Sequence, residues 1–386
     1  MEAMLALRRI ADHRVDIELV SSETAFHHRP LSVAEPFGLG EVEELPLEDF
    51  ARSHGAHYRR AAISSVDVAR KEVSTDSGAT LSYDALVLAT GARAREAVAG
   101  ALTFRGSEDT EALRALLSEI VRGEVSRVAF VLPAGANWPV PLYELAVMTA
   151  AHLKRLSQVG AELTLVTHEG SPLELFGDRA AAAAAELLST MDIGFVGRAY
   201  GRDFADRRLR LVPEGELAVD RVVAMPRLDG PALPGLPATP TGFIPTDRHG
   251  RVRGAPDVYA AGDVIDFPIK QGGLAAEQAD AVAQSIAAWA GVPLEAEPFR
   301  PVLRGQLLTG AAPLFLRADL AGGRGQTSEV SSTPLWWPPT KLAGKHLGPA
   351  LTAAGIGPPP PQLSPHAVSV TIDLDEVPID AVPRGR

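Results

Sequence analysis

The chain has 386 residues, of which 46% are hydrophobic and 22% charged, so it is long enough for two or three globular domains. A formal charge of −11 argues against a nucleic-acid partner, because phosphate binding needs a basic surface. The absence of cysteine excludes disulfides, Cys-based zinc sites and CxxC redox pairs, and no metal site is expected.

Strand and helix patterns alternate along most of the chain. Residues 1–12 predict a helix, and residues 15–20 predict a strand that ends in a turn. Further strands are expected at 57–63, 83–89, 127–132, 162–167, 193–196, 221–225 and 257–261, and helices at 108–121, 139–156, 178–190 and 273–290. Alternation of this kind indicates βαβ units and a parallel sheet, and hence an α/β fold.

The composition changes from about residue 296. Residues 299–320 predict a hairpin that turns at a Thr-Gly pair, followed by a Gly/Ser/Thr-rich loop at 321–333. The four prolines at 358–361 predict an extended linker.

The adjacent Trp336 and Trp337 permit two interpretations. With the lysines that follow, they predict peripheral contact with a membrane surface. Alternatively they pack over a cofactor or in a homodimer contact, and this packing is the favoured interpretation. No apolar run approaches the roughly 20 residues that span a bilayer, and no signal peptide is evident, so a cytoplasmic protein is expected.

Two apolar strands end in small residues. Residues 83–93 (YDALVLATGAR) run into Thr90 and Gly91, and residues 256–263 (PDVYAAGD) end in Gly262 and Asp263. Small residues let the backbone approach a ligand closely, and a carboxylate at a strand end can accept a hydrogen bond from a ligand hydroxyl. The alternative is a pair of buried strands with glycine turns, in which Asp263 caps a helix.

A helix is expected to begin just after Lys270, Gln271 and Gly272. Its first N–H groups are unpaired and carry the positive end of the helix dipole. Such an end stabilises negative charge on a bound ligand.

In this order, the two strand-end segments resemble the FAD-dependent pyridine nucleotide-disulfide oxidoreductase family, which includes type II NADH dehydrogenases and sulfide:quinone reductases. The resemblance covers roughly residues 1–295. It implies two Rossmann-like (doubly wound) dinucleotide-binding domains plus a small C-terminal α+β domain, with FAD as the cofactor. The residues that it assigns to cofactor binding are Ser21, Glu23, Arg29, Pro30, Thr90, Gly91, Arg93, Gly262, Asp263, Lys270, Gln271 and Gly272.

The N-terminal part of this resemblance is irregular. Ser21, with Glu23 two residues later, stands where the family has an acid that bonds the adenosine ribose. Residues 26–31 resemble the segment beside the isoalloxazine ring, which would bring His28 and Arg29 near the flavin; the alternative is a surface loop with solvated histidines.

Helix 1–12 matches the helix that follows the family's GxGxxG loop. That loop and its strand do not precede it. Two explanations remain open: the start is assigned too far downstream, which is favoured, or the flavin loop has been lost.

The loop that would bind a nicotinamide dinucleotide also departs from the pattern. After strand 127–132 it contains Pro133, Gly135 as the one remaining glycine, and Trp138 in place of the third glycine. Proline lacks the N–H that a phosphate would use, and the indole fills the space that glycine leaves. Glu169, just after the next strand, is placed as a ribose carboxylate would be. NAD(P)H is therefore a doubtful second cofactor.

These observations predict the following organisation and function. The FAD-binding domain comprises 1–105 and 226–295, an NAD(P)-binding-like domain 106–225, a C-terminal interface domain 296–354 and a Pro-rich tail 355–386. The expected function is FAD-dependent electron transfer with an unknown small-molecule donor and acceptor, NAD(P)H or a quinone among them. The catalytic residues are unknown. The alternative is an inactive Rossmann-fold relic that binds a ligand or a partner.

Overall fold

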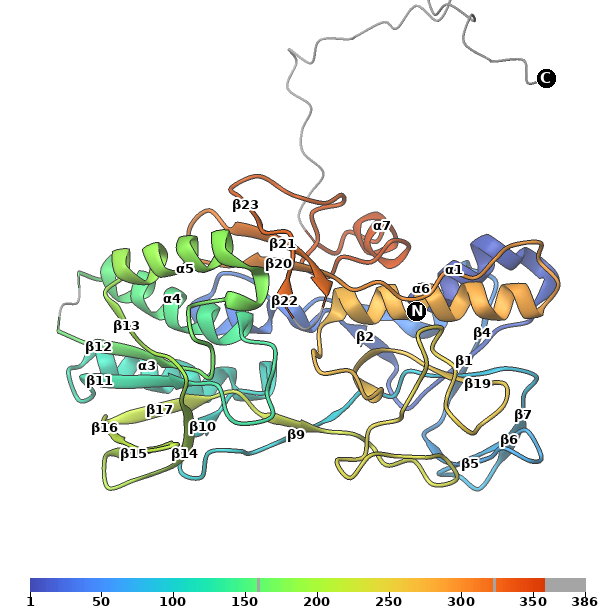
Figure 1. The fold of residues 1–386 in the computed structure, drawn as a ribbon, viewed down its shortest axis with the longest axis horizontal. Coiled ribbons are helices and arrows are strands. Elements are labelled where there is room, and N and C mark those ends of the chain that lie inside the picture. The colour runs from blue at the N-terminus through green and yellow to red at the C-terminus, as the bar shows by residue number, and fades with distance from the viewer. Residues whose placement is uncertain (158–159, 322–323, 358–386) are drawn as a thin grey trace, which may run out of the picture.

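The computed structural model describes residues 1–157, 160–321 and 324–357. The proline run at 358–361 lies outside the described residues. The fold is of the mixed α/β class, as the sequence predicts, with parallel strands in two separate regions (Figure 1).

The largest sheet has five parallel strands. Their order is β10 (Leu102–Thr103), β17 (Arg221–Ala224), β11 (Arg127–Val131), β12 (Glu162–Val166) and β13 (Ile193–Val196). The helices α3 (Thr110–Val121), α4 (Val140–Arg155) and α5 (Asp178–Thr190) share one apolar core with Val128 and Phe130 of β11. Ala129 and Val131 belong to the core on the opposite face, because successive side chains of a strand alternate between faces.

That opposite face is covered by a three-stranded antiparallel sheet. It consists of β14 (Tyr200–Ala205), β15 (Arg208–Val212) and β16 (Glu216–Ala218). Leu209 of β15 is fully buried against Ala129 and Val131. The sequence predictions did not include these three strands.

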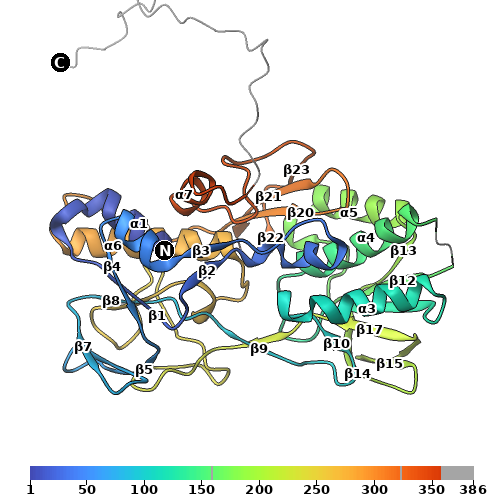
Figure 2. The ribbon, with the colours of Figure 1, turned by 180° about the vertical axis from the view of Figure 1, so that it is seen from behind.

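The second parallel region consists of two separate strand pairs. β1 (Glu18–Ser21) pairs with β4 (His57–Arg60), and β8 (Leu86–Leu88) pairs with β19 (Val258–Ala260). No described strand joins the two pairs. Helices α1 (Glu2–Ala11) and α6 (Gly272–Trp289) lie side by side against these strands (Figures 1 and 2).

The prediction of one strand at 57–63 was wrong. The structure has β4 at 57–60 and β5 (Ile63–Asp67), which belong to different sheets. The chain turns between them, where the amide of Ala61 donates to the Ser21 carbonyl and that of Ala62 to the Asp76 carboxylate. β5 then forms a meander with β6 (Glu72–Thr75) and β7 (Thr80–Ser82).

Short elements connect these regions. They are β2 (Ala25–His27), which pairs with β3 (Glu44–Pro46), β9 (Arg93–Arg95), which pairs with β18 (Arg227–Asp229), the helix α2 (Leu47–Ser53), and the 3₁₀ segments 12–14, 29–37, 107–109, 174–176 and 262–264.

The predicted C-terminal hairpin is confirmed. β20 (Val302–Leu307) pairs antiparallel with β21 (Leu314–Ala321), and β22 (Arg324–Gly325) and β23 (Glu329–Ser331) extend the sheet. Leu303, Leu307 and Leu316 join the core that contains α4 and α5, and α7 (Leu347–Ala353) follows. Within the described ranges, no helix has both the length and the apolar character needed to cross a membrane.

Candidate functional site

The ends of β8 and β19 bring the two strand-end segments together. The strands run parallel with Leu88 opposite Ala260, and the amide of Ala261 donates to the Leu88 carbonyl at 3.0 Å. Just beyond this pair, Gly91 has a φ of +71° and Gly262 a φ of +82°, which favour glycine. Exposed Thr90 and half-buried Asp263 therefore follow neighbouring strand ends.

Asp263 is a half-buried carboxylate that makes no hydrogen bond to the described residues. Burial raises its pKa, while the charges of Lys270 and Arg29 oppose that rise. Burial also lowers the pKa of Lys270 to about 8, against the attraction of Asp263 and Asp266. Arg29, Asp263 and Lys270 thus form one charged group built from separate parts of the chain.

The N-terminus of α6 offers free backbone donors beside this group. The Gln271 side chain caps the helix by accepting from the amide of Leu274 at 2.7 Å, and it also donates to the Arg304 carbonyl at 3.1 Å. The amides of Gly272 and Gly273 have no partner among the described residues. Gln271 is therefore a capping residue, and the two glycine amides remain for a ligand.

His28 lies next to Arg29 but is buried. Its side chain is 1% exposed, and neither ring nitrogen has a hydrogen-bond partner within the described structure. Burial, reinforced by the positive charge of Lys341, lowers the pKa of His28 to about 4. The imidazole is therefore neutral near pH 7, and the alternative of a solvated loop is wrong for this histidine.

The other predicted residues make no hydrogen bond or ion pair with Asp263 in the described structure. Ser21 ends β1, and its hydroxyl accepts from the amide of the exposed Glu23 at 3.1 Å. Pro30 stands in the first turn of the 3₁₀ helix that Arg29 begins. Arg93 lies on β9 opposite Asp229 of β18, in the connection between the two parallel regions.

Comparisons with known proteins show the family of the chain. The model of the pyridine nucleotide-disulphide oxidoreductase family matches residues 1–284. The chain belongs to this family. FAD is the cofactor of the family, and its members are oxidoreductases.

One curated relative and two solved structures illustrate the similarity. The ferredoxin–NAD(+) reductase component of the biphenyl dioxygenase system of Paraburkholderia xenovorans is 28% identical over 286 residues, which cover 67% of this chain and 63% of that protein. The sulfide:quinone oxidoreductase of Aquifex aeolicus superposes with a TM-score of 0.77 at 19% identity, over 86% of this chain and 83% of that one. A ferredoxin reductase of Rhodopseudomonas palustris gives a TM-score of 0.62 at 21% identity, over 83% of this chain and 80% of that one. At these identities the structures show a shared fold.

The residues at the ends of β8 and β19 fit one side of the family's FAD. Asp263, a carboxylate without a hydrogen-bond partner among the described residues, suits a ribityl hydroxyl. The free amides of Gly272 and Gly273, at the positive end of α6, suit an anionic edge of the isoalloxazine ring.

A buried ion pair beneath this region was not predicted. Lys341 (9% exposed) donates to both carboxylate oxygens of the fully buried Glu144, at 2.6 and 2.7 Å, and the amide of Leu308 donates to the same carboxylate. Burial raises the pKa of Glu144, and Lys341 opposes this rise. The one sequence signal was a lone acid within the apolar run LYELAVM of α4.

The two tryptophans have different environments. The indole N–H of Trp336 donates to the Thr340 carbonyl at 2.9 Å, and its ring packs edge-on against Phe315 at 5.3 Å. Trp337 is 67% exposed. The structure therefore shows packing for Trp336, and no membrane contact or dimer is shown for Trp337.

A cleft of about 300 Å³ lies between the loop after β11 and the segments 241–243 and 266–270. Its apolar lining includes Trp138, Met225, Phe243 and Phe267. Lys270 also lines it, with its ammonium 3.7 Å from the centroid of the Phe243 ring. The cleft therefore adjoins the charged group around Asp263.

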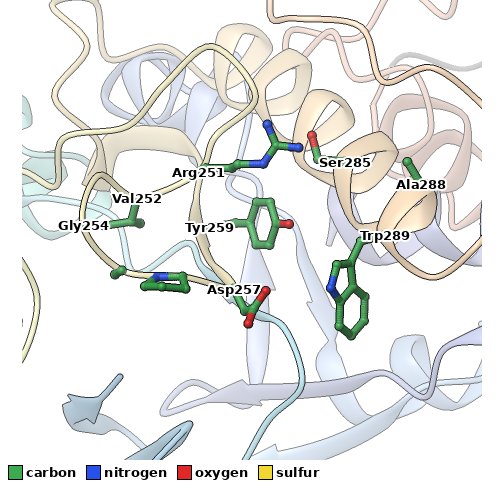
Figure 3. A pocket seen from close by; sticks show the side chains of 10 residues that line it. Arg251, Val252, Gly254, Asp257, Tyr259, Ser285, Ala288 and Trp289 are labelled. Atoms are coloured by element: carbon green, nitrogen blue, oxygen red, sulfur yellow. The ribbon is translucent and has the colours of Figure 1, made fainter. Parts of the chain in front are cut away.

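A larger depression, of about 780 Å³, lies elsewhere (Figure 3). It is lined by residues 251–252 and 254–257, by Tyr259, and by the C-terminal part of α6 with Trp289. Figure 3 shows Tyr259 between Arg251 and Trp289, with Asp257 nearby. These are the amino end of β19 and the carboxyl end of α6, so this depression is remote from Asp263 and Gly272.

Proposed function

We propose that the chain transfers electrons between a small-molecule donor and a small-molecule acceptor through FAD. In this proposal the cofactor is held by the part of the chain corresponding to residues 1–105 and 226–295, and residues 106–225 form the inserted domain. The C-terminal interface domain, 296–354, completes the molecule. Asp263 binds the ribityl chain, Thr90 and Gly91 approach the pyrophosphate, and the amides of Gly272 and Gly273 face the ring.

The observation that carries the proposal is the joint position of Asp263 and the α6 N-terminus. Within the described part of the chain, a carboxylate and two helix amides that all lack hydrogen-bond partners occur at adjacent strand and helix ends, although they come from different segments. Lys270 and Arg29 add positive charge there. Flavin supplies the redox chemistry when bound, and these residues bind and orient it.

The test is a visible absorption spectrum of the protein purified from its native source. We expect a flavin band. A colourless, well-folded protein would overturn the proposal.

A matched pair of variants tests the named carboxylate. Asp263→Asn removes the negative charge and should weaken FAD binding by roughly tenfold or more, since a hydrogen bond to a charged group contributes about 1.5–3 kcal/mol. Asp16→Asn, at an exposed position on the segment before β1, should bind FAD as the wild type does. Equal FAD affinity of Asp263→Asn and the wild type would remove Asp263 from the site.

A further inference from the structure

The first turn of α4 offers few backbone donors to a phosphate, although the amides of Ala134, Gly135, Asn137 and Trp138 in the loop before it have no partner among the described residues. Pro133, Pro139 and Pro141 have no N–H, and the amides of Leu142 and Tyr143 both donate to the Pro139 carbonyl, at 2.9 and 3.3 Å. Of the first three positions of α4, Val140 alone has an amide without a partner among the described residues, and that residue is buried. A dinucleotide pyrophosphate normally takes several such amides at a helix N-terminus.

The carboxylate at the end of β12 is also turned inward. Glu169 is 2% exposed, and one of its oxygens accepts from the hydroxyls of Tyr143 at 2.8 Å and Thr167 at 3.0 Å. Its other oxygen is buried and has no partner in the part of the chain that the structure describes. A ribose outside the sheet cannot reach this carboxylate while Tyr143 holds it.

An aromatic side chain occupies the position where the third glycine of a dinucleotide-binding loop would stand. Trp138 packs on the buried Phe176, with ring centroids 5.8 Å apart, and also lines the cleft. Three independent features therefore disagree with a nicotinamide dinucleotide here, although the family name refers to a pyridine nucleotide.

The cleft itself suits another kind of ligand. Trp138, Phe243 and Phe267 present aromatic surface, and Asp266 and Lys270 bring one charge of each sign to the lining. The Lys270 ammonium donates to the Ile265 carbonyl and makes no ion pair with a carboxylate among the described residues. A volume of about 300 Å³ is at the lower end of the usual range for small-molecule sites. Aromatic walls favour a planar ring, and an ammonium that makes no ion pair among the described residues favours a negative charge on that ring.

We infer that this cleft binds a compact, planar aromatic anion and that the adjoining α4 terminus holds no NADH or NADPH. The inference rests on the proposed function in one respect, namely that the anion belongs to the class of electron-transfer substrates. Binding itself can be measured apart from flavin content, so a missing flavin band and a missing ligand are separate results.

The experiment is isothermal titration calorimetry on the full chain, with the flavin content recorded from the visible spectrum. The probes are naphthalene-2-carboxylate, its neutral amide naphthalene-2-carboxamide, NADH and NADPH. We expect the carboxylate to bind at least about tenfold more tightly than the amide, a difference of about 1.4 kcal/mol. NADH and NADPH should show no saturable binding up to about 1 mM.

Variants locate the binding. Lys270→Met should remove the preference for the carboxylate over the amide, whereas Trp138→Ala should weaken both probes. Lys154→Met, at an exposed position near the C-terminal end of α4, serves as the matched control. It should change neither the preference for the carboxylate nor the affinity for either probe. Thermal unfolding of each variant checks that it is folded.

Three results would overturn the inference. One is saturable binding of NADH or NADPH at micromolar concentration. Another is equal affinity for the carboxylate and the amide in the wild-type protein. The third is a preference for the carboxylate that survives in Lys270→Met.

Discussion

At the scale of single residues, Glu169 links burial to pH. Burial raises its pKa to about 7, whereas an unfolded glutamate has a pKa near 4.5. Between these values the folded protein keeps a proton that the unfolded chain has released, so stability falls as the pH rises through this window and levels off above about 7. At low pH the contribution of the buried neutral carboxyl is fully present.

Glu169→Gln should abolish this dependence. From about pH 4.5 to about pH 8, the wild type should lose roughly 2–3 kcal/mol of unfolding free energy relative to the variant. Urea unfolding at both pH values measures it, with Glu214→Gln at an exposed position as the control. Parallel pH profiles for the wild type and Glu169→Gln would show that the carboxyl is ionised in the folded state.

The Glu144–Lys341 pair should behave differently from the ion pairs at the surface. Lys341→Met leaves a carboxylate buried without its partner, which typically costs about 3–5 kcal/mol. The double variant Glu144→Gln/Lys341→Met should be more stable than the single one, because no uncompensated charge remains. Arg52→Met, which breaks an exposed pair with Glu48, should cost at most about 1 kcal/mol. Chemical denaturation of all three compares these costs, and a small loss for Lys341→Met would mean that water reaches Glu144.

At the scale of elements, the cap of α6 orders the helix end on which the proposed flavin site depends. Gln271→Ala removes the hydrogen bond to the Leu274 amide and the hydrogen bond to the Arg304 carbonyl. The free energy of unfolding should fall by about 1–2 kcal/mol. Gln271→Asn keeps a capping oxygen, so it should recover the contribution of the cap but not that of the hydrogen bond to the Arg304 carbonyl of β20. Thermal melts separate the two effects. Equal melting temperatures for wild type and Gln271→Ala would show that the cap is dispensable.

The apolar parallel strands and the long helices were predictable from the sequence. The helix at 178–190 and the strand at 193–196 have the predicted bounds, and β11, β12 and β17 differ by one residue each. Each of these elements is marked in the sequence by a continuous apolar run or by apolar residues at helical spacing, and such a pattern depends only on neighbouring residues. The antiparallel strands β14 to β16 were not predicted, although in β15 exposed Arg208 and Arg210 alternate with Leu209 and Leu211, a pattern typical of a half-buried strand.

The candidate site was partly predictable, because some of its residues stand at the ends of apolar strands that the sequence reveals. The family resemblance assigned both Thr90 and Asp263 to cofactor binding, and the parallel pairing of β8 with β19 places the carboxyl ends of their strands at one edge. Glu144, Phe243 and Lys341 meet their partners only through folding, and no sequence spacing relates them. Long-range packing therefore decided the cleft and the ion pair.

At the scale of the whole molecule, the C-terminal hairpin shares a core with the five-stranded sheet region. Leu303, Leu307 and Leu316 pack in the same cluster as Phe176 and the inner face of α4. β8 belongs to a different cluster, built with β5, β6 and β19. The hairpin and the helices α4 and α5 should therefore lose their protection together, although they are far apart in the sequence.

Two matched leucines test this division of the molecule. Leu316→Ala on β21 and Leu88→Ala on β8 remove the same atoms from nearly complete burial, and each should cost about 2–5 kcal/mol. Amide hydrogen exchange should then speed up in α4 and α5 for Leu316→Ala, and in β5, β6 and β19 for Leu88→Ala. The same exchange pattern in both variants would mean that the molecule unfolds as one cooperative unit. In that case the two apolar clusters would not correspond to separate stability units.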